Sequence, residues 1–135
     1  MNALLVEQAW LTATAAIYAP LAGYCGTNAD VIPNEDPIVV FLCEECQHKA
    51  GKYWTALLKI EVDAPAMVEG TQTTYSSVWT DLLAWLADKA LVEAAFPSEN
   101  VDLNGYFVRT SGQGMRDNRW IASIELLVGV STAGA

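Results

Sequence analysis

Residues 53–63 read YWTALLKIEVD, and this stretch decides the fold of the chain. Apolar side chains occupy every second position from Trp54 to Val62, and the positions between them are mostly polar, with Leu57 as the exception. A period of two with one polar face is typical of a strand in an antiparallel sheet that is covered on one side. The stretch therefore predicts such a sheet, and the other elements are predicted outward from it.

A second strand precedes this one. Residues Ile38 to Cys43 form a short run of branched and aromatic side chains, which is typical of a strand by composition. The polar stretch from Glu44 to Lys52, which contains Ala50-Gly51 near its end, connects the two strands. The two strands are therefore predicted to form a hairpin.

The C-terminal part of the chain predicts a second hairpin. Its first strand runs from Gly105 to Thr110 and its second from Arg119 to Ser131. The second strand alternates almost without interruption, with its apolar residues from Trp120 to Val130 facing inward. Residues Ser111 to Asn118, which are rich in Gly, Asp and Asn, are predicted to be a flexible hairpin tip.

The N-terminal residues predict a helix from Asn2 to Ala19. Apolar or neutral side chains follow one another at steps of three or four residues, which is helical spacing with a wide apolar face. Pro20 stops this helix. The positions on which this face is predicted are Leu4, Gln8, Leu11 and Ala15, with Leu5, Ala9, Ala13 and Ala16 beside them.

A second helix is predicted between the two hairpins. It begins at a cap formed by Ser76 or Ser77, has Asp81 in its first turn, and ends near Phe96-Pro97. Loops are expected at Leu21 to Asp36 and at Val68 to Tyr75. The predicted fold class is therefore α+β, an antiparallel sheet of two hairpins packed by two helices in the order α-ββ-α-ββ. Residues 1–135 are expected to form a single domain.

The composition leaves contact with other protein chains open and argues against sequence-specific nucleic-acid binding. Hydrophobic residues make up 53% of the chain and charged residues 17%, with a mean hydropathy of +0.23. Such a composition indicates either a thick core or a surface that another chain covers. Proteins that hold nucleic acid neutralise phosphates with Lys and Arg, whereas this chain has a net charge of −9. The acidity indicates either solubility or a surface that faces DNA without binding it.

No membrane partner is expected. The apolar stretch from Met1 to Tyr18 lacks a basic start, contains Glu7 and Gln8, and is too short to span a bilayer. The chain has three cysteines, an odd number that forms no complete disulfide set. A thiol-reducing compartment is therefore expected.

One cluster of residues has the composition of a chemical site. Cys43, Cys46 and His48 lie within six residues, and with Cys25 they offer the ligands of a Cys3His zinc site. However, Cys43 ends an apolar run, and Glu44-Glu45 supplies neither the Gly nor the Pro that tightens a zinc knuckle. We therefore expect structural cysteines, with no metal and no cofactor, and zinc binding stays the alternative.

No arrangement of catalytic residues is recognised. His48 is the only histidine, and no Ser or Cys motif marks a nucleophile that it would serve. The adjacent carboxylates Glu44-Glu45 point to opposite faces of a strand. The pair Gly112 and Gly114 lacks the strand-then-helix context of a phosphate-binding loop. The chain is therefore not expected to be an enzyme.

Several stretches, taken in this order of elements, resemble the tail terminator (tail-tube completion or neck) proteins of long-tailed bacteriophages. The residues from Pro37 to Leu42 look like the first strand of that family, and those from Tyr53 to Val62 look like its second. The helix from Ser77 to Ala95 fits the central helix of the family. The residues from Arg116 to Leu126, an aspartate-containing turn followed by Trp and an alternating run, fit its last strand.

This resemblance implies a structural virion protein that is made in the host cytoplasm and ends in the tail or neck of the virion. Subunits of this family form a ring, expected to be a homohexamer, that caps the tail tube and ends its polymerisation. The implied partners are other copies of the chain, the tail tube protein and the head-tail connector or stopper protein. A ring of head-to-tail contacts uses two different surfaces on each subunit. The interface candidates are His48, Lys49, Trp79, Gln113, Arg116 and Arg119.

Three other functions stay open at this point. The chain is alternatively another neck or head-completion subunit, or a small α+β adaptor module that binds one partner protein. A metal-dependent or redox protein built on the cysteines and His48 is the third alternative. Ring assembly, a stable monomer with one partner, and stoichiometric zinc would distinguish them.

Overall fold

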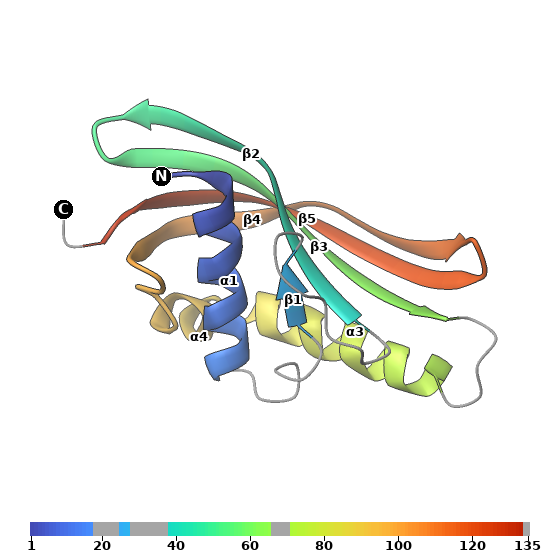
Figure 1. The fold of residues 1–135 in the computed structure, drawn as a ribbon. Helices are drawn as coiled ribbons and strands as arrows, with labels where there is room; N and C mark the ends of the chain where they lie inside the picture. Colours follow the sequence, from blue (N-terminus) through green and yellow to red (C-terminus); the bar gives the residue numbers. More distant parts are fainter. Residues whose placement is uncertain (18–24, 28–37, 66–70, 134–135) are drawn as a thin grey trace.

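The structure is a computed structural model that describes residues 1–17, 25–27, 38–65 and 71–133. The fold is α+β, as predicted, with helices on one side of a five-stranded sheet (Figure 1). The sheet has the order β1-β2-β3-β5-β4. The elements are α1 (Ala3–Ile17), β1 (Cys25–Thr27), β2 (Ile38–Ala50), β3 (Tyr53–Pro65), α3 (Thr71–Ala87), α4 (Lys89–Ala94), β4 (Val101–Arg116) and β5 (Arg119–Thr132).

Four long antiparallel strands form the body of the sheet. The predicted hairpins are confirmed as β2–β3 and β4–β5, and they are joined because β3 also pairs with β5. The short strand β1 was not predicted. It lies within the expected loop Leu21 to Asp36 and pairs in parallel with Val39–Phe41 of β2. Three residues are too few to show a period of two, so only the pairing partner reveals this strand. The rest of that loop lies outside the described residues.

Both hairpins are longer than predicted. Strand β2 continues through most of the polar stretch Glu44 to Lys52, and β4 continues through most of Ser111 to Asn118. The turns contain only two residues each, and Asp117 and Asn118 adopt positive φ angles of 53° and 60°, as a two-residue hairpin turn requires. The prediction failed here because residues 44–50 and 111–118 are nearly all exposed. A strand without a buried face shows no apolar alternation.

Helix α1 exists as predicted, but its predicted apolar face is only partly buried. Ala9 and Ala13 of that face are buried together with Val6 and Trp10, whereas Leu4 is 57% exposed. The helix is apolar on nearly all sides, so the spacing of apolar residues does not select one face.

The second predicted helix is two helices. Helix α3 begins at Thr71, so Ser76 and Ser77 are exposed positions inside the helix rather than caps. Residues 71–75, which were expected to belong to a loop, are helical. Asp81 therefore lies beyond the first turn. The chain breaks at Asp88, whose side chain accepts a 3.1 Å hydrogen bond from the backbone N–H of Leu91 and caps α4. The break was not predicted because the apolar spacing continues across it.

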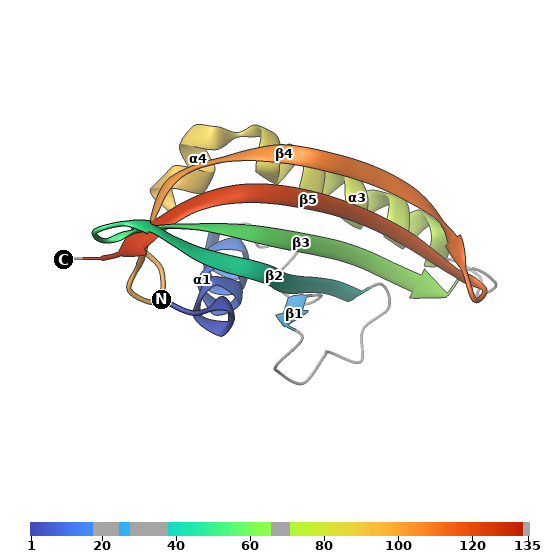
Figure 2. The ribbon, with the colours of Figure 1, turned by 90° about the horizontal axis from the view of Figure 1, so that it is seen from above.

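The core lies between the sheet and the helices. Figures 1 and 2 show α1, α3 and α4 on the same face of the sheet. The alternation in β3 and β5 is confirmed, since their inward side chains are almost fully buried from Ala56 to Ala64 and from Ala122 to Val130, with Trp54 and Trp120 half-buried. The largest fully buried side chains are Trp10, Trp85, Phe41, Leu58, Ile60, Leu82, Ile124 and Leu126. No described helix lies on the opposite face of the sheet, which we call the uncovered face.

Candidate functional site

Among the residues of the predicted zinc alternative, the structure describes the side chains of Cys43, Cys46 and His48, and these form no metal-binding cluster. Cys43 and Cys46 lie on β2 and His48 lies near its end, while Cys25 is in β1 with its backbone opposite Val39. The His48 ring packs 4.9 Å from the Trp54 ring, and its Nε2 lies 2.7 Å from the carbonyl oxygen of Gly51. Within the described part of the chain, no three Cys, His, Asp or Glu side chains are placed to share a metal ion. The side chain of Cys25 is outside that part.

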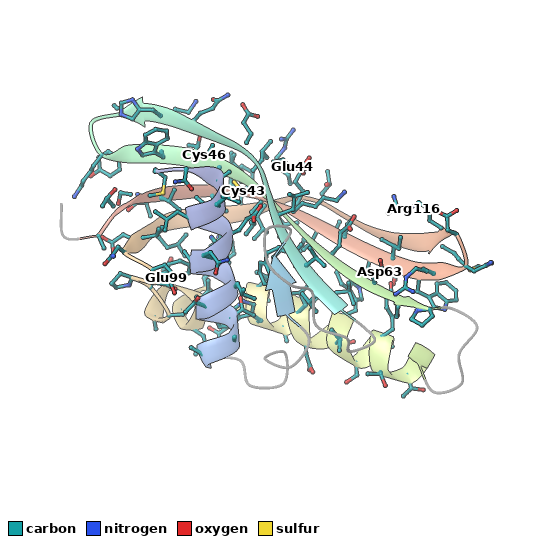
Figure 3. All side chains as sticks on the ribbon, in the orientation of Figure 1. Cys43, Glu44, Cys46, Asp63, Glu99 and Arg116 are labelled. Carbon is teal, nitrogen blue, oxygen red and sulfur yellow. The ribbon has the colours of Figure 1, made fainter. Side chains whose placement is uncertain are left out.

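Both described thiols have raised pKa values. Burial raises the pKa of the Cys43 thiol to about 12, and the nearby Cys46, Glu7 and Glu44 raise it further than the hydrogen bond to Glu45 lowers it. Burial also raises the pKa of Cys46, against the opposing effect of the N-terminal ammonium. Both sulfur atoms lie on the side of β2 that faces α1 (Figure 3). Because the thiolate is the nucleophile and the redox-active form, this pair is suited to packing rather than to chemistry.

Glu7 is a buried acid that the sequence analysis missed. It is 2% exposed, and its Oε1 accepts a 2.8 Å hydrogen bond from the backbone N–H of Cys43. Its Oε2 is buried without a hydrogen-bond partner. This bond joins α1 to β2 at an irregularity in the strand, where Glu44 is an extra residue between Cys43 and Glu45. Glu7 is the one charged residue of α1, and this was the signal that pointed to it.

The uncovered face carries an apolar row across three strands. Leu57 of β3, Leu127 of β5 and Phe107 of β4 are paired neighbours, and Phe107 is 54% exposed. Leu57 was the exception in the predicted alternation, and the row explains why an apolar side chain stands there. A groove beside the row is lined by Glu45, Gln47, Lys49, Thr55, Ala56, Leu57, Arg109 and Leu127. Exposed apolar surface rimmed by polar groups is typical of a protein-binding surface.

Basic and acidic side chains form ion pairs on the uncovered face beside the apolar row, so their charges balance one another. Lys59 pairs with Glu61 at 3.1 Å, and Arg109 pairs with Glu125 at 3.5 Å. Arg119 pairs with Asp63 near the end of the sheet. Arg119, which was predicted as an interface residue, therefore has a carboxylate partner within its own chain.

The other interface candidates fall into two groups at the ends of the hairpins, apart from Trp79. Trp79 is half-buried and packs against the core from α3. The Lys49 Nζ donates a 3.2 Å hydrogen bond to Gln47, beside His48. At the other hairpin, Gln113 accepts a 3.3 Å bond from the Tyr75 hydroxyl, and Arg116 is exposed at the end of β4 (Figure 3). These positions stay predictions of an interface.

The two hairpin ends lie at opposite ends of the sheet (Figure 1). We call residues 45–57 of the β2–β3 hairpin the first arm, and residues 110–125 of the β4–β5 hairpin the second arm. Each arm begins at a bulge in its outer strand, between Cys43 and Glu45 in β2 and between Val108 and Thr110 in β4. In the register of the sheet, Tyr53 of the first arm lies opposite Ser131, near the end of β5. Arg119 of the second arm lies opposite Pro65, the last residue of β3. The arms therefore offer two separate surfaces.

The fold and these surfaces define a small α+β protein with one covered and one uncovered sheet face. No family model matches the sequence. No curated protein matches it either. Among the described residues, no helix has the length and apolar character needed to cross a membrane.

A solved structure with this fold is a chain in the structure titled "Virion of native gene transfer agent (GTA) particle". The two chains are 13% identical and superpose with a TM-score of 0.52. The superposition covers 96% of this chain and 95% of the other. A likeness at this level of identity shows a shared fold.

Proposed function

We propose that this chain is a structural component of a phage-like virion, namely the subunit of a ring that caps the tail tube. In this role it ends polymerisation of the tube protein and joins the tube to the head connector or stopper protein. The observation that carries the proposal is the likeness to a chain of a gene transfer agent virion over nearly the full length of both chains. A match of the whole chain supports a common architecture better than a match of one hairpin would.

The placement of the two arms supports a ring. Head-to-tail contacts that close into a ring require two different surfaces on each subunit. The first arm carries His48 and Lys49 and the second carries Gln113 and Arg116, at opposite ends of the sheet. The apolar row on the uncovered face supplies further surface for the tube or the connector.

The distribution of charge supports a channel through which DNA passes without being held. Residues 71–99 contain Asp81, Asp88, Glu93 and Glu99 against Lys89 alone, so the helical side of this segment has a net charge of −3. Phosphate groups are repelled by such a surface. On the uncovered face, by contrast, Lys59, Arg109 and Arg119 each pair with a carboxylate.

The test is the oligomeric state of the purified chain, measured by native mass spectrometry over a range of protein concentrations. The proposal predicts a closed ring at a mass of six times the 14.6 kDa subunit, either alone or after addition of tail tubes. Co-sedimentation with purified tail tubes, at one ring per tube end, tests the capping role separately. A chain that stays monomeric with tubes present and does not sediment with them would refute the proposal.

The apolar row also favours a second candidate function, an adaptor that binds one partner protein. Leu57, Leu127 and Phe107 form a contiguous surface that an unrelated protein can cover. An adaptor would stay a monomer at every concentration and would form a complex of fixed stoichiometry with its partner. Substitution of Phe107 by Ser would weaken that complex, whereas a ring built through the arms would still assemble.

A further inference from the structure

The two outer edges of the sheet are closed near the helices. On β4, the Lys89 side chain donates a 3.2 Å hydrogen bond to the backbone carbonyl of Tyr106. On β2, strand β1 pairs with Val39–Phe41, and Glu7 accepts the N–H of Cys43. On β4 this bond satisfies one backbone group, whereas on β2 the partners cover Val39–Phe41 and Cys43, just before the bulge.

Beyond the bulges, both edges are open. From Thr110 to Arg116 the pairing of β4 with β5 is regular, every residue is exposed, and no described strand lies on the outer side. On β2, the segment Glu45–His48 is regular between two bulges and also lacks a described outer neighbour. Natural proteins protect long free edges with Pro, with Lys or with a covering segment. Residues 110–116 contain neither Pro nor Lys and include Met115, which is 58% exposed.

The strand directions allow one edge to complete the other. Three successive antiparallel pairings separate β2 from β4, so these two strands run in opposite directions within one chain. A second copy related by rotation and placed beside the first therefore presents its β2 antiparallel to β4. The free backbone groups of both edges are then able to form a regular ladder.

The side-chain faces restrict the register of such a ladder to steps of two residues. Gln113 and Met115 lie on the helical side of the sheet, opposite Ala122 and Trp120. Cys46 lies on the same side, opposite Ala56. Because directly paired residues share a face, Met115 pairs with an inward residue of the next copy.

We propose that residues 113–116 of one copy pair in an antiparallel ladder with residues 45–48 of the next copy, and that this contact closes the ring. Met115 then lies opposite Cys46 and Gln113 opposite His48. On the uncovered face, the guanidinium of Arg116 lies opposite the Glu45 carboxylate. Opposite charges directly across a ladder stabilise it, and like charges destabilise it.

The proposal rests on the ring proposed above and adds a geometric consequence. The two open segments lie at opposite ends of the sheet as well as on opposite edges (Figures 1 and 2). Joining them offsets each copy from the next along the strand direction. A closed sheet with such an offset has strands that are tilted relative to the ring axis.

The experiment is site-specific cross-linking with a short bis-maleimide, in full-length protein that carries Cys25→Ser throughout. The variant Met115→Cys is expected to give a ladder of covalent oligomers up to the full ring, through the native Cys46 of the next copy. The reaction is run at mildly alkaline pH because burial raises the pKa of Cys46. The matched control is Val108→Cys, which is 47% exposed on the closed part of the same strand and is expected to give no ladder.

Two further variants separate this contact from its alternatives. Adding Cys46→Ser to Met115→Cys is expected to abolish the ladder, whereas a surviving cross-linked dimer would show a two-fold contact between β4 edges and overturn the proposal. Arg116→Glu is expected to dissociate the ring, and Glu45→Arg in the same chain is expected to restore it. Rings that form without this cross-link would refute the strand pairing and leave the proposed function intact. The absence of any oligomer, with or without tail tubes, would refute both.

Discussion

The hydroxyl of Tyr106 donates a 2.7 Å hydrogen bond to the backbone carbonyl of Leu86. Both residues are nearly inaccessible, with exposed fractions of 6% and 4%. Leu86 is the second-last residue of α3, so its carbonyl has no partner within the helix. The tyrosine therefore satisfies a helix end that water does not reach.

Replacing Tyr106 by Phe removes this hydroxyl and leaves the ring in place. The Leu86 carbonyl then stays buried without a partner, which costs about 1–3 kcal/mol. Since the substitution leaves only the volume of one oxygen atom, we expect the lower half of that range, about 1.5 kcal/mol. For a chain of this size, the corresponding decrease in melting temperature is roughly 3–6 °C.

The matched control is Tyr75→Phe. The Tyr75 ring is buried to the same 6% exposure, but its hydroxyl donates to the side chain of the exposed Gln113, at 3.3 Å. Water replaces that partner without cost, so we expect a change below about 0.5 kcal/mol. The two variants are compared by urea unfolding at neutral pH, with the slope of the transition used to confirm that the unfolded states are alike.

Equal stability of the two variants would refute the argument. It would mean that the Tyr106 hydroxyl contributes no more to the free energy of unfolding than a hydroxyl in contact with water. Water would then have access to the C-terminal end of α3. A decrease for Tyr75→Phe that exceeds the decrease for Tyr106→Phe would refute it as well.

Three other predictions concern single residues. Burial raises the pKa of Cys43 to about 12 in the folded state, against 9.0 for an ordinary thiol. Between these two pH values the unfolded chain loses the proton more readily than the folded chain, so the free energy of unfolding is expected to fall as the pH rises from 9.0 toward 12. Cys43→Ala should flatten that part of the curve, and an unchanged slope would contradict the assignment. Glu7→Ala leaves the buried Cys43 N–H without its acceptor and is expected to lower the free energy of unfolding by about 1–3 kcal/mol, measured by urea unfolding. Glu7→Gln is expected to have a stability closer to that of the native protein because an amide oxygen also accepts this bond. Asn118→Ala is expected to cost about 1 kcal/mol in the same assay because its φ is 60°, while Asn118→Gly should not destabilise the protein.

The parts of the fold that the sequence predicts are those with one buried face. The alternation in β3 and β5 identified both strands and their inward side chains, because burial on one side imposes a period of two. The outer parts of β2 and β4 show no such period since both of their faces meet solvent. Helix α1 failed in the opposite way, because apolar residues on every side leave its orientation to the tertiary contacts of Trp10.

The candidate surfaces were predictable only in part. His48, Gln113 and Arg116 were expected at the hairpin ends, and the structure places them there. Glu7 was not expected in the core, because nothing in its neighbours along the chain marks which turn of the helix meets β2. The apolar row on the uncovered face depends on the register of three strands, and register is a property of pairing that a single strand does not carry.

The two bulges have a consequence for how proteins of this shape diverge. They lie near the same row of the sheet, beside Leu58 and Leu126, and beyond them the outer strands β2 and β4 are mostly exposed. Adding two residues to each strand of an arm lengthens it by about 7 Å and returns every side chain to its original face. Adding one residue to each strand turns the two faces over. The length of an arm is therefore able to change in steps of two residues per strand without turning its side chains to the other face.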